Sequence, residues 1–129
     1  MTAARQRVAQ QYQQLFESMP EIVAPKALEE VSHVWHLFVI RLRTEMLSID
    51  RGRFIELMRE KGVATSVHYI PIHYHSVYRQ LFGDLQGQFP NTESAYEGVV
   101  SLPIYPSLTE AQVQRVGETA IDIVRRHRR

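Results

Sequence analysis

Three histidines lie close together in the middle of the chain, at His68, His73 and His75. Imidazole is the commonest zinc ligand, and three imidazoles together could form an open catalytic metal site. However, Pro71 separates His68 from the other two, and no His-Glu-x-x-His helix places two histidines on one face. A small histidine-dependent metal-binding protein is therefore only an alternative interpretation, and we assign no metal ligands.

Two arginines end the first strongly apolar stretch of the sequence. Arg41 and Arg43 could bind a carboxylate ligand, because a guanidinium group matches a carboxylate with two parallel hydrogen bonds. Glu45 lies nearby in the sequence, and most pairs of this kind are ordinary surface contacts. We therefore expect the two arginines to form a surface ion pair with Glu45.

Composition limits the classes of protein to consider. The 129 residues are 44% hydrophobic, which suits one domain that folds by itself, and the formal net charge is +1. This charge gives no field that would attract nucleic acid. The arginine-rich end at 125–129 has no interleaved aromatic residues, so we predict a frayed, solvated terminus. The absence of cysteine is typical of a cytoplasmic protein, and no apolar run is long enough to span a membrane.

Hydrophobic periodicity predicts the elements that position these side chains. Five amphipathic helices are predicted, over residues 3–19, 51–61, 73–82, 92–96 and 110–124. Three strands are predicted, over residues 35–42, 63–70 and 99–102. This order predicts an α+β fold in which helices cover one face of a small sheet.

Local signals give further detail on these elements. The N-caps are predicted at Asp50, Asn91 and Thr109. The first strand is apolar at both alternating positions, which indicates a strand that is largely buried. In the helix over 73–82, the apolar residues are expected to point inward, namely Val77, Leu81 and Phe82.

The order of several short motifs resembles one known family. His-Tyr-Ile-Pro-Ile-His at 68–73 follows a strand-helix-strand pattern and precedes Phe89-Pro90, Ser101-Leu102-Pro103 and Leu108-Thr109. In this order and spacing, the chain resembles the C-terminal domain of the DegT/DnrJ/StrS family of pyridoxal-phosphate-dependent sugar aminotransferases. The resemblance implies a small, mainly antiparallel sheet covered by helices, like the small domain of fold-type I pyridoxal-phosphate-dependent transferases.

The resemblance also implies a role for the central motif. In the sugar aminotransferases this loop borders the opening through which the nucleotide sugar and the amino donor reach the cofactor. Carried over by position, it implies that His68, Tyr69 and His73 bind substrate and that Pro71 fixes the turn. Imidazole and phenol groups suit this role, because they form hydrogen bonds with sugar hydroxyls and phosphate. Alternatively, His68 and Tyr69 are half-buried strand residues whose polar atoms are satisfied by neighbouring groups.

The chain has two lysines, Lys26 and Lys61. An aminotransferase of this kind holds pyridoxal phosphate as a Schiff base on a lysine that is desolvated or near other cations. Lys26 follows Pro25 in a polar connection, and Lys61 stands in the last turn of a helix before Gly62, so both should be solvated. We therefore expect no catalytic residue and no bound pyridoxal phosphate in this chain, and a cofactor held elsewhere in the intact enzyme.

These observations favour one interpretation. Residues 1–129 are predicted to be a single domain, with 1–19 as an interdomain-type helix and 33–129 as the α+β core. The intact enzyme would be an aminotransferase that acts on nucleotide-linked keto sugars with an amino-acid donor, and this chain alone should be catalytically silent. Its expected partners are a catalytic domain or a second copy in the cytoplasm, with no nucleic acid and no membrane. The other alternative is a stand-alone binding module.

Overall fold

A three-stranded antiparallel sheet lies at the centre of the computed structural model, which describes residues 1–129. The strands are β1 (Ile22–Val23), β2 (Phe38–Leu42) and β3 (Val99–Leu102), in the order β1-β2-β3. Along β2 the apolar residues at alternate positions are buried, whereas Arg41 is exposed. The two faces of the sheet are therefore different: β2 is largely buried, as predicted, and Arg41 is its one exposed residue.

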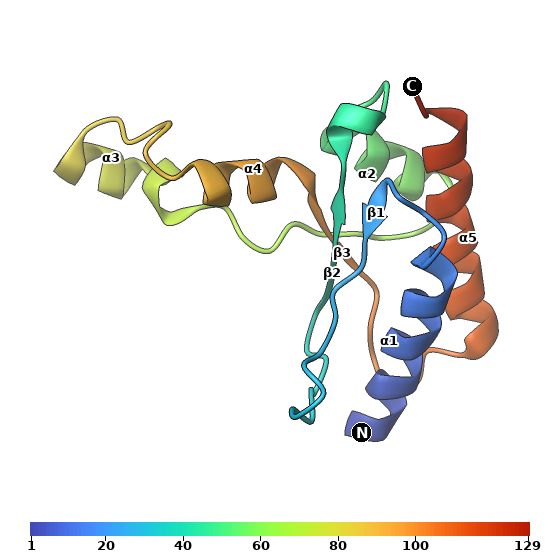
Figure 1. Ribbon diagram of the computed structural model, residues 1–129. Helices are drawn as coiled ribbons and strands as arrows, with labels where there is room; N and C mark the ends of the chain where they lie inside the picture. The colour runs from blue at the N-terminus through green and yellow to red at the C-terminus, as the bar shows by residue number, and fades with distance from the viewer.

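Helices cover the buried face of this sheet. Figure 1 shows α1 (Thr2–Phe16) and α5 (Glu110–Arg126) side by side on that side of the sheet, and their apolar stripes form much of the core. The two helices approach closely at Gly117, where a Cβ atom would lie 2.5 Å from Leu15 Cδ1. A third helix, α2 (Arg51–Glu60), contacts α5 and β3 and buries Phe54 and Met58. None of the helices combines the length and the apolar character that crossing a membrane requires.

Tyr12 joins α1 to the chain beyond β3. Its ring is fully buried against Phe38, and its hydroxyl donates a hydrogen bond of 3.0 Å to the carbonyl oxygen of Pro103. Burial, with a smaller contribution from Tyr105, raises the pKa of the Tyr12 phenol. Tyr12 therefore stays protonated and serves as a structural hydrogen-bond donor.

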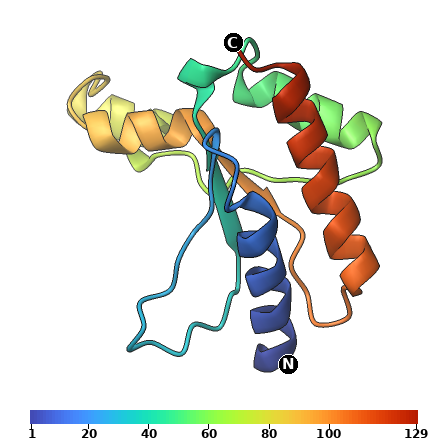
Figure 2. The ribbon, with the colours of Figure 1, turned by 45° about the vertical axis from the view of Figure 1, so that its right-hand side comes forward.

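Helices α3 (Ser76–Phe82) and α4 (Pro90–Gly98) belong to an arm that extends away from the sheet (Figures 1 and 2). We define the arm as residues 68–98; it also contains η2 (Ile72–Tyr74). α4 leads directly into β3, with no residue between Gly98 and Val99. At this junction a Cβ atom on Gly98 would lie 2.3 Å from the carbonyl oxygen of Leu42. Only glycine permits this approach of the arm to β2.

The predicted fold class and two of the three predicted caps are confirmed. Asp50 Oδ1 accepts a hydrogen bond of 2.8 Å from the backbone N–H of Arg53, and Thr109 forms a capping box with Gln112. The cap at Asn91 is wrong, because α4 begins one residue earlier at Pro90, whose ring fixes a helical φ and whose missing N–H needs no partner there.

The strand predicted over 63–70 does not form. Its segment makes a single bridge to the sheet, between Ser66 and Ser101, because the chain then leaves the sheet toward the arm. The first strand likewise begins only at Phe38; before it, Trp35 has a φ of 48°, which lies outside the extended region. A 3-10 turn, η1 (Thr44–Met46), follows β2.

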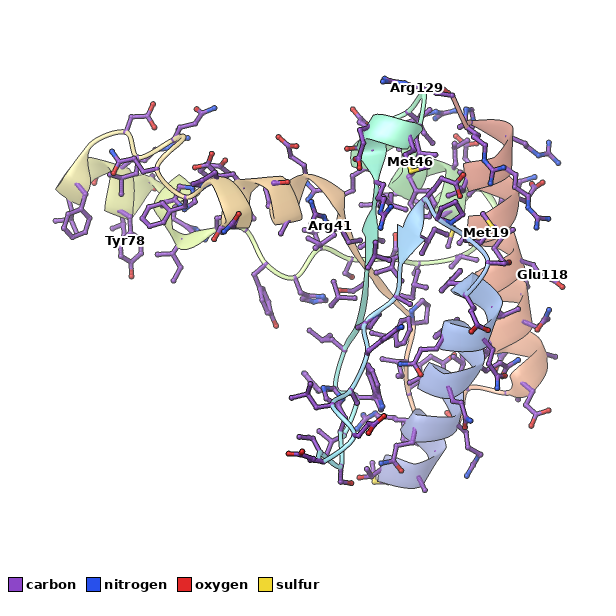
Figure 3. All side chains as sticks on the ribbon, viewed as in Figure 1. Met19, Arg41, Met46, Tyr78, Glu118 and Arg129 are labelled. Atoms are coloured by element: carbon purple, nitrogen blue, oxygen red, sulfur yellow. The ribbon has the colours of Figure 1, made fainter.

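The inward orientation predicted for the helix over 73–82 is wrong. α3 has no buried residue, and its apolar side chains are largely exposed, with Leu81 at 69% and Phe82 at 64%. The reason is positional: α3 contacts η2 but lies at the far end of the arm, away from the sheet and from α1, α2 and α5 (Figures 1 and 2). In Figure 3 the side chain of Tyr78 points away from the rest of the arm.

The C-terminus is held in place, so the prediction of a frayed end is wrong. The backbone N–H of Ser48 donates to His127 O at 2.7 Å, and the N–H of Arg129 donates to Met46 O at 3.0 Å. Between them, the guanidinium group of Arg128 forms an ion pair with the fully buried carboxylate of Glu21. Neither carboxylate oxygen of Glu21 accepts a hydrogen bond from another group, so Arg128 is the only polar partner of this carboxylate.

Gly98 provides a test of the junction between the arm and the sheet. In Gly98→Ala the new methyl group meets a backbone carbonyl that cannot move aside, so the free energy of unfolding should fall by about 1–3 kcal/mol. Gly52→Ala is the matched control, because Gly52 is exposed in α2 and alanine favours helix by up to about 1 kcal/mol. Urea denaturation measures both changes, and equal stability of the two variants would contradict the close approach.

Arg128 provides a test of the C-terminal contact. Arg128→Met leaves the buried Glu21 carboxylate without a partner, which should cost about 1–3 kcal/mol of folding free energy. Arg126→Met is the control, since Arg126 pairs with Asp122 on the surface and should matter by no more than about 1 kcal/mol. Thermal and urea unfolding distinguish the two variants. If both lower stability equally, residues 127–129 are not a specific contact.

Candidate functional site

The central motif begins on the face of the sheet that the helices leave uncovered. Ser101 of β3 lies opposite Val39 of β2, so their side chains share this face, away from the core side chains of Ile40 and Val100. The segment that enters the motif runs beside Ser101, since Ser66 and Ser101 exchange backbone hydrogen bonds of 2.8 and 3.2 Å. The sheet therefore determines where the motif starts.

His68 is held on this face by one ring nitrogen. Its Nδ1 lies 2.8 Å from Ser101 Oγ, whereas its Nε2 makes no hydrogen bond within the chain. The ring packs edge-on against the ring of Tyr69, with 4.8 Å between the centroids. Tyr69 is 71% exposed and its hydroxyl has no hydrogen-bond partner within the chain. His68 Nε2 and the Tyr69 hydroxyl are therefore the polar side-chain atoms of this pair that have no partner within the chain.

His73 has a different environment, inside the arm. It is buried, and its Nε2 lies 3.1 Å from Glu93 Oε1 of α4. The same carboxylate accepts hydrogen bonds of 2.8 and 3.0 Å from the backbone N–H of Gly87, and the ring of Phe89 packs against the imidazole. Glu93 therefore ties together η2, the loop between α3 and α4, and α4 itself.

The carboxylate of Glu93 also affects a neighbouring side chain. Desolvation, followed by the negative charges of Glu93 and Glu97, raises the pKa of the Tyr74 phenol. Tyr74 contacts the rings of both His73 and Tyr96, so it completes the small aromatic cluster of the arm. His75 follows as an exposed residue. No group of three or more histidine, aspartate or glutamate side chains in the chain is arranged to hold a metal ion.

Arginines attach α4 to the body of the molecule. Arg41 Nη2 donates a hydrogen bond of 2.9 Å to Ser94 Oγ, so the predicted pair with Glu45 is wrong for this residue. Figure 3 shows Arg41 at the corner where the arm meets the sheet. Arg51 donates to the carbonyl oxygen of Tyr96 and lies 4.4 Å from the centre of its ring. Arg41 remains exposed on the same face of the sheet as Ser101.

Two residues of the site were not identified from the sequence, Ser101 and Glu93. Ser101 is the single polar residue in the otherwise apolar strand Val-Val-Ser-Leu, and this break in the apolar pattern is the sequence feature that could have indicated it. No sequence feature indicated Glu93, because a glutamate in a surface helix is ordinary and its partner His73 lies 20 positions earlier in the chain.

The lysines do not fit attachment of pyridoxal phosphate. Lys26 and Lys61 are both exposed, and neither lies in the motif or on the face of the sheet that carries His68. A Schiff-base lysine needs an enclosed pocket that lowers its pKa and groups that hold the phosphate. Lys26 lines an open cavity of about 730 Å³ that also includes Arg43, but it remains exposed there, so this is not the enclosed site that a Schiff base requires.

The chain is similar to known proteins over nearly its whole length. Uncharacterized protein MJ1066 of Methanocaldococcus jannaschii is 38% identical over 128 residues, which are 99% of this chain and 33% of that protein. Spore coat polysaccharide biosynthesis protein SpsC of Bacillus subtilis is 33% identical over 126 residues, which are 97% of this chain and 32% of SpsC.

The fold is also found in Helicobacter pylori PseC, an aminotransferase involved in the biosynthesis of pseudoaminic acid. The TM-score is 0.87 at 22% sequence identity, over 97% of this chain and 33% of PseC. The chain thus spans about a third of the length of these relatives. The family model described as the DegT/DnrJ/EryC1/StrS aminotransferase family matches residues 1–120, and the chain belongs to this family.

Proposed function

We propose that this chain is the C-terminal domain of a pyridoxal-phosphate-dependent aminotransferase that acts on a nucleotide-linked keto sugar. The observation that carries the proposal is the family match over residues 1–120, together with coverage of about a third of each relative. In this proposal residues 1–129 form one domain, α1 continues toward the cofactor domain, and the intact enzyme works in the cytoplasm. The amino group comes from an amino-acid donor.

The contribution of this domain is to bind and orient the substrate. His68 and Tyr69 present polar atoms without partners on an open face, and a phenol and an imidazole suit the hydroxyl and phosphate oxygens of a nucleotide sugar. We also propose a substrate contact for His73, although it is buried inside the arm; Glu93 occupies its Nε2, so Nδ1 is the ring nitrogen that can meet a ligand. Arg41, on the same face, is a further group that can meet an anionic ligand.

The cofactor supplies the chemistry of amino transfer when it is bound. Because Lys26 and Lys61 are exposed, the lysine that holds pyridoxal phosphate would belong to another part of the intact enzyme. The open face beside His68 then needs a second wall, which the cofactor domain would supply. In this proposal, residues 1–129 therefore contact the substrate, and another domain of the intact enzyme holds the cofactor.

The exposed arm supports association with another protein surface. Many of its large apolar side chains are exposed, namely Tyr69, Ile70, Ile72, Val77, Tyr78, Leu81, Phe82 and Phe89. Contiguous apolar surface of this kind is typical of interaction sites. We propose that a cofactor domain or a second copy covers it in the intact enzyme.

Pyridoxal phosphate provides the first test of this division. The purified chain mixed with the cofactor should give no stoichiometric adduct after borohydride reduction and no amino transfer from an amino-acid donor, because both lysines are solvated. Mass spectrometry of the reduced protein measures the adduct, and bovine serum albumin at the same lysine concentration shows the nonspecific background. A single modified lysine at full occupancy, with turnover, would overturn the proposal.

Tyr69 provides the second test, in a chimera in which residues 1–129 replace the corresponding third of SpsC. Tyr69→Phe removes one hydrogen bond to substrate, worth about 0.5–1.5 kcal/mol, so KM for the keto-sugar nucleotide should rise about 2–12-fold at similar kcat. Tyr105→Phe is the control, since Tyr105 is also exposed but lies outside the motif. Equal KM values in both variants would remove Tyr69 from the site. A chimera that folds and binds cofactor but transfers no amino group would count against the whole proposal.

A further inference from the structure

We infer that Ser101 is a positioning residue for His68: its hydroxyl fixes the imidazole as an N–H donor directed toward the open face of the sheet. The ligand of that donor rests on the proposed function, whereas the role of Ser101 rests on the geometry of this chain alone. No residue of the central motif lies on β3, so this assignment extends the site into the sheet.

The hydroxyl group of Ser101 has few possible hydrogen-bond partners. Ser101 is 5% exposed, and its backbone N–H and carbonyl are both paired with Ser66. The hydroxyl proton therefore needs an acceptor within the protein. His68 Nδ1, at 2.8 Å, is the only side-chain atom that forms a hydrogen bond with Ser101 Oγ.

This contact determines which ring nitrogen of His68 carries the proton. A neutral imidazole has one donor nitrogen and one acceptor nitrogen. If Nδ1 accepts from the serine hydroxyl, the proton is on Nε2, which makes no other hydrogen bond within the chain. His68 then offers an N–H beside the exposed hydroxyl of Tyr69. The His68 N–H recognises an acceptor oxygen of the substrate and cannot pair with a group that only donates, whereas the Tyr69 hydroxyl can donate or accept.

His73 serves as an internal comparison. The Glu93 carboxylate can only accept hydrogen bonds, so it requires the proton of His73 to be on Nε2 as well. The two histidines should therefore have the same tautomer for different reasons. A change at Ser101 should affect His68 and leave His73 unaltered.

The test is long-range ¹H–¹⁵N NMR of the imidazole rings in the chain as it stands, at about pH 8.5, where an ordinary imidazole with a pKa of about 6.5 is neutral. A His68→Gln variant assigns the signals. In the wild-type chain, His68 should be protonated on Nε2 alone. In Ser101→Ala its two ring ¹⁵N shifts should move toward each other as the tautomers average, and Ser101→Thr, which retains the hydroxyl, should restore the wild-type shifts.

Two results would overturn the inference: protonation of wild-type His68 on Nδ1, or unchanged His68 shifts in Ser101→Ala. The amide signals of Ser66 and residue 101 show whether the bridge between them survives in each variant. If Ser101→Ala does not fold, the wild-type and threonine spectra decide, and loss of the Nε2 tautomer in the threonine variant counts against the hydroxyl. Because no ligand is present, failure of the proposed function leaves this result unaffected.

Discussion

The direct passage from α4 into β3 at Gly98 is the constraint on which the rest of the structure depends. With no loop between helix and strand, and with Leu42 O against the position of a missing Cβ atom, the arm has one direction relative to the sheet. Both histidine contacts come from this continuous segment: Glu93 lies before the junction and Ser101 after it. The shape of the site therefore follows from one backbone contact.

Stability is distributed unevenly between the two sides of that junction. The body has a continuous core in which α1 and α5 pack on the sheet, and the C-terminal residues close it through the ion pair of Arg128 with Glu21. The arm has few buried side chains, and α3, with seven residues, is too short to be stable without tertiary contacts. Its few internal contacts, centred on Glu93 and the aromatic cluster, hold a surface whose apolar side chains remain uncovered. The buried hydrophobic core therefore lies in the body of the molecule and not in the arm.

The two histidines His68 and His73 lie in one motif but have different hydrogen-bond partners. His73 is turned inward and paired with a carboxylate, so it maintains the arm. His68 is held by a serine through Nδ1, and its Nε2 makes no hydrogen bond within the chain. Neither exposed lysine lies in the central motif that contains these histidines.

The sequence by itself was sufficient for features that depend on local chemistry: the helix caps at Asp50 and Thr109, the amphipathic stripes of α1 and α5, the α+β class and the family. It was insufficient wherever the outcome depended on a distant partner. The exposed face of α3, with Phe82, was predicted to be buried because an apolar stripe does not reveal whether anything lies against it. The hydrogen bonds of Ser101 and Glu93 to the histidines join residues 33 and 20 positions apart. Such contacts exist only after the sheet and the arm have been placed, because periodicity reports the environment of a side chain and not the identity of its neighbour.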